Sequence, residues 1–161
     1  MLDGRRRASI VGPGTLRDAA RCGIATSQRL KVLDVLIEGN GECGILNGDN
    51  KSLTLRDVDI VGNAGEGIAG NLLSAGLGDG RFSANHLEVR DNDGIAIRLF
   101  APGKYKIRNF VIRDNAGGLV VQGSKPGILA NGEILTHVCD LVAFIPPRQQ
   151  GRVAIGTRCA P

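Results

Sequence analysis

The chain has 161 residues, a net charge of +4 and 42% hydrophobic residues, values that suit one globular domain with its own core. It contains 24 glycines but only four Phe, one Tyr and no Trp, so Ile, Val and Leu must fill the core, and these favour β-strands. The modest positive charge alone does not indicate a nucleic acid as partner.

The N-terminal stretch MLDGRRRASIVGPG is basic, but no apolar segment follows it, so we expect no signal peptide. The Arg5–Arg7 run is interpreted as solvated charge because no aromatic side chains accompany it for base stacking. No segment approaches the ~18 consecutive apolar residues of a membrane helix. We therefore expect a soluble chain without membrane or nucleic-acid partners, either cytosolic or cut from a longer exported parent.

A strand is expected from about residue 8, followed by an insertion at 14–23. The sequence TLRDAARCG in this insertion predicts one or two helical turns, with Thr15 as N-cap and Gly23 just past the end.

An internal repeat then dominates the chain. An asparagine followed by glycine and an aliphatic residue recurs at spacings of 23, 29 and 23 residues. Similar steps reach His137 towards the C-terminus and Pro13 towards the N-terminus. The asparagines that mark the repeat are Asn40, Asn63, Asn92 and Asn115.

Aliphatic residues hold fixed positions relative to these marks and alternate with polar ones, which is the periodicity of strands. The predicted first strand centres on Val32, Leu55, Ala84, Ile107 and Leu129. The second carries, three residues before each mark, Ile10, Ile37, Ile60, Val89, Ile112 and Ile134, and five before it, Ala8, Val35, Val58, Leu87, Phe110 and Gly132. The third starts at Ile45, Ile68, Ile95, Leu119 and Leu141.

Three short strands per unit of about 22 residues, with glycine-rich corners, describe one rung of a parallel β-helix. The prediction is an all-β solenoid of about six rungs that forms a single domain over residues 1–161. Each asparagine would occupy a corner, tolerate a left-handed backbone there, and stack on its neighbours ~4.8 Å away. The 29-residue step implies a loop insertion at 69–85, and PPRQQ at 146–150 should interrupt the last rung.

The series IEGN, IVGN, VRDN and IRDN, each followed by Gly and then Ile or Leu, resembles the right-handed parallel β-helix (pectate-lyase-like) superfamily over nearly the whole chain. The resemblance implies that the asparagine ladder lies between the second and third strands. It also implies polysaccharide chemistry on the first-strand face, beside the loops that follow the third strand. A leucine-rich repeat is the alternative fold, because LKVLDVLIEGN looks like one such unit, although YKIRNFVIRDN lacks its leucine framework.

The outward positions of the first strand are strongly basic. Of twelve such positions between residues 29 and 108, seven are Lys or Arg and none is acidic, whereas the outward second strand is acidic. One interpretation is a groove for an extended anionic ligand, and the other is a solvated surface balanced by ion pairs across the corner. The predicted ligand-binding residues are Arg29, Lys31, Arg56, Arg81, Lys104 and Lys106.

The outward third strand is apolar, which is typical of a contact surface. It is covered either by a loop or tail of this chain or by identical chains in a homo-oligomer. Its expected column is Leu46, Ala69, Ala96, Val120 and Val142.

Candidate catalytic residues lie beside the 69–85 loop: His86, Asp57 and Arg108. Proton abstraction next to a uronate carboxylate needs a base, which His86 would supply, and cations that neutralise the carboxylate, which Arg56 and Arg108 would supply. The alternative interpretation is that His86 is a surface histidine without a catalytic role.

Asp57 and Asp59 share one side of a strand, but no partner carboxyl group for hydrolysis is fixed across a cleft. The motifs of polygalacturonases and a calcium-binding Asp cluster are absent, so we expect no cofactor and leave open whether the chain is an enzyme.

The four cysteines allow two interpretations. Cys22 and Cys43 each precede Gly-Ile, so neighbouring rungs would bring them close enough for a disulfide, and Cys139 and Cys159 are a similar distance apart in sequence. The favoured interpretation is nevertheless four buried thiols. No CxxC spacing occurs, so no zinc site is expected.

Two functions remain open from the sequence. The first is binding or processing of an acidic polysaccharide along the basic strand face, with lyase, epimerase or glycoside hydrolase chemistry if the chain is an enzyme. The second is a non-catalytic structural module, such as a tail-spike, adhesin or scaffold segment, that associates through the apolar strand face.

Overall fold

The computed structural model describes residues 7–48, 52–70, 80–100, 103–122, 125–143 and 147–156. In these residues the chain forms strands and no helix. One parallel sheet contains, in spatial order, β1 (Arg7–Arg17), β3 (Arg29–Glu38), β5 (Leu53–Val61), β7 (Arg81–Arg90), β9 (Lys104–Arg113), β11 (Ile128–Leu135) and β13 (Arg148–Ile155). The other contains β2 (Ile24–Thr26), β4 (Ile45–Asn47), β6 (Ile68–Gly70), β8 (Ile95–Phe100), β10 (Gly117–Gln122) and β12 (Leu141–Ala143).

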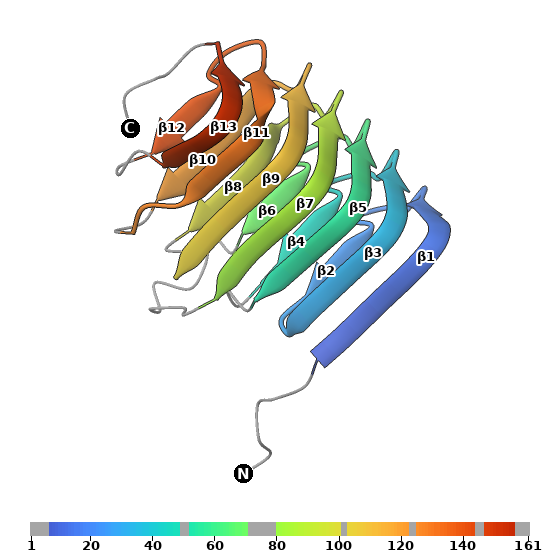
Figure 1. Cartoon of the computed structure of the whole chain (residues 1–161). Helices are drawn as coiled ribbons and strands as arrows, with labels where there is room; N and C mark the ends of the chain where they lie inside the picture. The colour runs from blue at the N-terminus through green and yellow to red at the C-terminus, as the bar shows by residue number, and fades with distance from the viewer. Residues whose placement is uncertain are drawn as a thin grey trace.

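The chain alternates between the two sheets, so each long strand and the short strand after it make one turn of a coil (Figure 1). About six turns stack along one axis, and every pairing is parallel. This confirms the predicted parallel β-helix and excludes a leucine-rich repeat, because the described residues contain no helix and the second sheet closes each rung.

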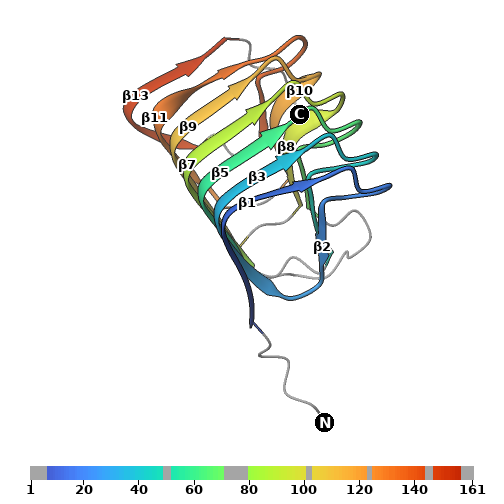
Figure 2. The ribbon, with the colours of Figure 1, turned by 90° about the vertical axis from the view of Figure 1, so that its right-hand side faces the viewer.

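Each long strand turns a corner in its middle, as Figure 2 shows. The predicted first and second strands are therefore the two arms of one bent strand. The residue at the corner has a left-handed backbone, which Asp, Asn and His adopt more readily than other side chains. The corner residues are Asp34 (φ 55°), Asp57 (φ 53°), His86 (φ 52°), Asn109 (φ 47°) and Asn131 (φ 51°).

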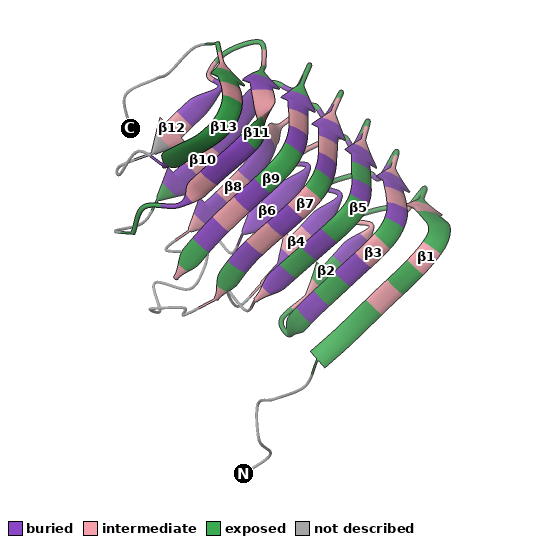
Figure 3. Cartoon of the chain, in the orientation of Figure 1, coloured by how far each residue is buried: buried purple, intermediate pink, exposed green. Residues whose placement is uncertain are grey.

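The core is a set of aliphatic columns that run along the axis, one residue per rung. In β3, β5, β7 and β9 burial alternates until the corner, where two consecutive residues face outward, and then resumes (Figure 3). The pairing stacks Val32 on Leu55, and both side chains are at most 1% exposed. Burying one such side chain contributes roughly 1.5–3 kcal/mol, so these columns supply much of the stability.

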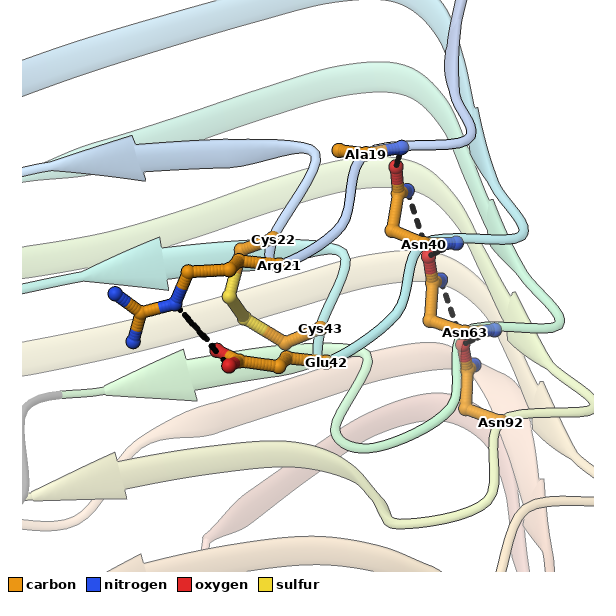
Figure 4. Close-up of a disulfide and its surroundings, with 8 residues drawn as sticks. All are labelled: Ala19, Arg21, Cys22, Asn40, Glu42, Cys43, Asn63 and Asn92. Atoms are coloured by element: carbon orange, nitrogen blue, oxygen red, sulfur yellow. Dashed lines mark hydrogen bonds and ion pairs between the residues drawn. A yellow bond between two sulfur atoms is a disulfide. The ribbon is translucent and has the colours of Figure 1, made fainter.

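A ladder of asparagines lines the next corner, inside the coil (Figure 4). Asn40 donates through Nδ2 to Oδ1 of Asn63 at 2.8 Å, and Asn63 donates to Asn92 at the same distance. Asn92 in turn donates to Asn115, also at 2.8 Å. All four side chains are at most 2% exposed, so the predicted asparagine ladder is confirmed and is buried.

A disulfide joins Cys22 to Cys43 beside this ladder, with a Cα–Cα distance of 4.4 Å (Figure 4). Cys139 is disulfide-bonded as well, and Cys159 lies outside the described residues. The favoured interpretation of four free thiols is therefore wrong. Parallel rungs bring the two Gly-Ile turns into register, and that placement makes the bond possible.

The first rung differs from the prediction. Thr15 lies in β1 rather than at a helix N-terminus, because β1 continues to Arg17 in pairing with β3. The ladder position of this rung is Ala19, whose backbone N–H donates to Oδ1 of Asn40, and not Pro13. Ile10 therefore stacks on Val32 of the first arm instead of on the second arm.

Two other predicted boundaries change. Ile97, not Ile95, pairs with Ile68, since β8 is two residues out of the expected register. The PPRQQ segment was expected to interrupt the last rung; residue 146 lies outside the described residues, and Arg148 begins β13, which pairs with β11 and continues the stack. Of the predicted 69–85 insertion, 69–70 belong to β6 and 81–85 to β7, while 71–79 lie outside the described residues.

No helix that could cross a membrane occurs in the part of the chain that the structure describes.

Candidate functional site

The first arms of β3, β5, β7 and β9 form the basic face that the sequence predicts. Lys31 pairs with Thr54, Ser83 with Lys106, and Asn85 with Arg108, so the expected register is confirmed. Among the described residues only Arg56 of the seven cations forms an ion pair, with Asp57 at 3.2 Å. The seven cations of the basic face are Arg29, Lys31, Arg56, Arg81, Lys104, Lys106 and Arg108.

Two hollows lie on this face. The N-terminal hollow has a volume of about 290 Å³ and is lined by Arg7, Ala8, Arg29, Leu30, Lys31, Ser52 and Thr54. The C-terminal hollow has a volume of about 640 Å³ and is lined by Arg81, Phe82, Ser83, Lys104, Tyr105, Lys106, Lys125, Pro126, Gly127, Ile128 and Arg148. They meet at neighbouring rungs, since the Arg81 backbone N–H donates to Ser52 Oγ at 3.3 Å.

The corner between the two arms holds a histidine–aspartate pair. His86 Nδ1 lies 3.0 Å from Asp57 Oδ1 on the preceding rung. A carboxylate oxygen only accepts hydrogen bonds, so the contact with Asp57 selects the tautomer with the proton on Nδ1, in which Nε2 of the neutral ring has the lone pair. Asn85 Nδ2 lies 3.3 Å from the same Nδ1, and Asn109 Nδ2 donates to Asn85 Oδ1 at 2.9 Å. An oriented histidine of this kind can accept a proton through Nε2.

The structure thus brings together two of the three predicted catalytic residues. Arg108 lies one column away from His86, on the first arm, in the row Arg56, Asn85 and Arg108. Among the described residues, Arg108 forms no hydrogen bond or ion pair with His86 or Asp57. A cation therefore flanks Asn85 on each side along the axis, one rung before and one rung after.

The second arms carry the acidic face, and its two cations, Arg90 and Arg113, are both ion-paired. Arg90 Nε lies 2.9 Å from Glu88 Oε1, and Arg113 Nη2 lies 3.5 Å from the same oxygen. Burial raises the pKa of Asp59, as does the negative charge of Glu88, while Arg90 lowers it. A shallow hollow of about 370 Å³ runs between the corner and this face, lined by Asp34, Asp57, Asp59, His86, Leu87, Glu88, Asn109 and Val111.

The expected apolar column on the second sheet is interrupted. Ala96 is 0% exposed and belongs to the core, and Arg98 takes its place opposite Ala69 and Val120. Arg98 Nη2 lies 2.8 Å from Glu66 Oε1, and burial raises the pKa of Glu66 while Arg98 opposes that shift. The column as built is Ala25, Leu46, Ala69, Arg98, Val120 and Val142.

Asp57 and His86 were predicted as site residues, but the left-handed corner column that they share was not predicted, and neither were the cations Lys125 and Arg148 of the C-terminal hollow. The corner column was readable as Asp, Asp, His, Asn and Asn, each six residues before a repeat mark. Lys125 and Arg148 carried no such signal, because they flank strand starts after irregular connections.

In the described ranges no group of three or more His, Cys, Asp or Glu side chains is placed to hold a metal ion. No protein-family model, curated protein or solved structure matches this chain.

Proposed function

We propose that this β-helix binds an acidic polysaccharide along its basic face. The observation that supports the proposal is the set of seven cations of which six have no carboxylate partner among the described residues. The acidic face offers a contrast, because both Arg90 and Arg113 are paired there, Arg90 with Glu88 and Asp91 and Arg113 with Glu88. A surface that merely balanced its own charge would pair the basic face in the same way.

The arrangement of the cations suits an extended polymer. Residues of one column repeat every ~4.8 Å along the axis, a spacing similar to the length of one sugar unit. The two hollows lie on adjoining rungs of one face, so a single chain can reach both. The resemblance to pectate-lyase-like proteins supports the same face, since members of that superfamily act on polysaccharides there.

The His86–Asp57 pair is the candidate general base for a reaction on the bound polysaccharide. Asp57 orients the imidazole so that Nε2 takes the proton next to a uronate carboxylate, and Arg56 and Arg108 neutralise that carboxylate. Such a step is the start of a lyase or an epimerase reaction. The test is the ultraviolet absorbance of unsaturated uronate during incubation with polygalacturonate or alginate. Asp57→Asn and His86→Gln should both abolish a lyase signal, and Arg113→Ala should keep it.

The disulfide between Cys22 and Cys43 supports an oxidising compartment, because such bonds persist mainly in exported proteins. Acidic polysaccharides of cell walls and extracellular matrices are found outside the cytosol, so the proposed ligand and the disulfide agree.

Binding is tested by isothermal titration with polygalacturonate and alginate. Arg56→Ala combined with Lys106→Ala should weaken binding at least tenfold, since each lost charge-assisted contact contributes about 1.5–3 kcal/mol. Arg113→Ala, which removes a cation from the acidic face, is the matched control and should bind as the wild type does. Equal binding by all three proteins would contradict the proposal.

The alternative is a structural module that associates through the second sheet. Arg98 and Glu66 weaken this route, because a charged pair stands in the middle of the apolar column. An oligomer whose mass depends on concentration and is lost on Val120→Asp, together with no glycan binding, would favour the alternative.

A further inference from the structure

The C-terminal hollow collects five cations, more than the N-terminal hollow on the same face. Its cations come from three strands of one sheet and from one turn: Arg81 on β7, Lys104 and Lys106 on β9, Arg148 at the start of β13, and Lys125 in the turn before β11. None of the residues that line it is acidic. The N-terminal hollow has three cations, Arg7, Arg29 and Lys31.

These five cations are kept close together without a counter-charge. Arg81 pairs directly with Lys104 on the next strand, and none of the five forms an ion pair with a described residue. Two charges at neighbouring-strand spacing repel by roughly 1 kcal/mol even in water, and more where side chains exclude solvent. A bound anion offsets this repulsion. The hollow is therefore expected to bind negatively charged groups.

The floor of the hollow is formed by two buried aromatic rings. Phe82 and Tyr105 are 5% and 2% exposed, and a Cβ on Gly127 would lie 2.1 Å from the Tyr105 ring, so Gly127 packs flat against it. Burial raises the pKa of Tyr105 to about 12, with the Gly127 backbone N–H opposing the shift. Tyr105 therefore stays neutral and adds no negative charge to the site.

The size of the hollow limits its ligand to a short stretch of polymer. A volume of about 640 Å³ lies within the range of pockets that take one small ligand. One or two sugar units fill such a space. Uronic acids bring one negative charge per unit, which leaves most of the five cations unmatched. A better match is a sugar that carries several charged ester groups.

We propose that the C-terminal hollow binds a sulfated sugar unit, with Arg81, Lys104, Lys106, Lys125 and Arg148 contacting the sulfate ester oxygens. The inference deepens the proposed function and rests on it in one respect, because it takes the ligand to be a polysaccharide. Lysine and arginine form charge-assisted hydrogen bonds with such oxygens, and five cations can neutralise two or three sulfates on adjacent positions.

A nucleic acid is a different polyanion, and the hollow lacks what a single strand needs. Bases stack on accessible aromatic rings, whereas Phe82 and Tyr105 are buried under the surface.

The experiment measures binding of three probes by isothermal titration: chondroitin sulfate, chemically desulfated chondroitin, and sucrose octasulfate. The first two differ only in sulfate, and the third is a compact sulfated sugar without uronic acid. Lys104→Ser combined with Lys125→Ser removes two of the five cations that line the C-terminal hollow. Arg29→Ser combined with Lys31→Ser does the same to the N-terminal hollow and is the matched control. All four side chains are exposed, so folding is not at risk, and melting temperatures check this.

We expect chondroitin sulfate to bind at least tenfold more tightly than its desulfated form. Lys104→Ser with Lys125→Ser should weaken sucrose octasulfate binding at least tenfold, and Arg29→Ser with Lys31→Ser should weaken it less than threefold. Equal binding of both chondroitins, with polygalacturonate also bound, overturns the inference and leaves the proposed function standing. Binding of no polysaccharide at all overturns the proposed function, and the inference then fails with it. Tighter binding of single-stranded poly(dT) than of chondroitin sulfate overturns both.

Discussion

At the residue scale, Asn63 shows how one amide holds two rungs together. Its Oδ1 accepts hydrogen bonds from the backbone N–H of Asn40 at 3.1 Å and from Asn40 Nδ2 at 2.8 Å. Its own Nδ2 donates to Asn92. Because the ladder is buried, none of these groups can form a hydrogen bond with solvent water instead.

Asn63→Ala should therefore be strongly destabilising. It leaves two donors of Asn40 and part of the Asn92 acceptor unsatisfied, and each buried unsatisfied group costs about 1–3 kcal/mol, so we expect a loss of about 3–5 kcal/mol. Urea denaturation at pH 7 measures it. The control is Asn85→Ala, which removes an amide from the exposed corner and should cost less than about 1 kcal/mol. A similar loss in both variants would show that the ladder has no special part in stability.

Asp59 gives the fold a dependence on pH. Burial and Glu88 raise its pKa above the ordinary value of 3.8, so the folded state binds this proton more tightly than the unfolded state does. The stabilising contribution is complete below pH 3.8 and is lost as the pH rises through the folded-state pKa. Asp59→Asn removes a partly desolvated charge beside Glu88, so the variant should be more stable than the wild type at pH 7 and equal to it near pH 3. Denaturation at both pH values tests this, and a difference that persists unchanged at pH 3 would contradict the assignment.

At the element scale, the sequence predicted the central rungs more accurately than the edges. Val35, Val58, Leu87 and Phe110 share one column in the structure as expected, because rungs of nearly equal length must stack their aliphatic residues in register. The repeat marks from Asn40 to Asn115 were equally readable, since each amide is hydrogen-bonded to the next in the buried ladder.

β1 and β8 could not be placed from the repeat alone. β1 has a register shift between Val11 and Gly14, so counting from Asn40 assigned Ile10 to the wrong arm. In β8 the turn after Asn92 is followed by two hydrophobic residues, Ile95 and Ile97, and both fit a strand start. Pairing with β6 decides between them, and such pairing is a tertiary contact that no local pattern encodes.

The candidate site was likewise predicted only in part. The basic face followed from periodicity, because alternate residues of a strand share one side. The His86–Asp57 contact did not, since it depends on a left-handed corner that directs both side chains outward on adjacent rungs. Lys125 joins the C-terminal hollow only through the path of the turn before β11.

At the scale of the whole molecule, a solenoid gains its stability from neighbouring rungs, and a terminal rung has only one neighbour. β1 pairs with β3 alone, and its residues are exposed or half-buried, with Val11 66% exposed. Ile10 and Leu16 at this end, and Val153 and Ile155 at the other, are only partly buried against the core. Both ends of the stack should therefore open more readily than the centre.

The Cys22–Cys43 disulfide secures the N-terminal end, because it ties the first rung to the second across 21 residues. By the loop-closure relation its removal costs about 3 kcal/mol. Replacing both cysteines with serine should therefore raise hydrogen exchange of the amides in β1 and β3 by about two orders of magnitude. Exchange in β7 and β9 should change much less, which serves as an internal control and also distinguishes local opening from global unfolding. Serine replacement avoids a reducing agent, which would also break the bond at Cys139. Uniform acceleration across all strands would mean that the stack unfolds as one unit and that the disulfide does not act on its end.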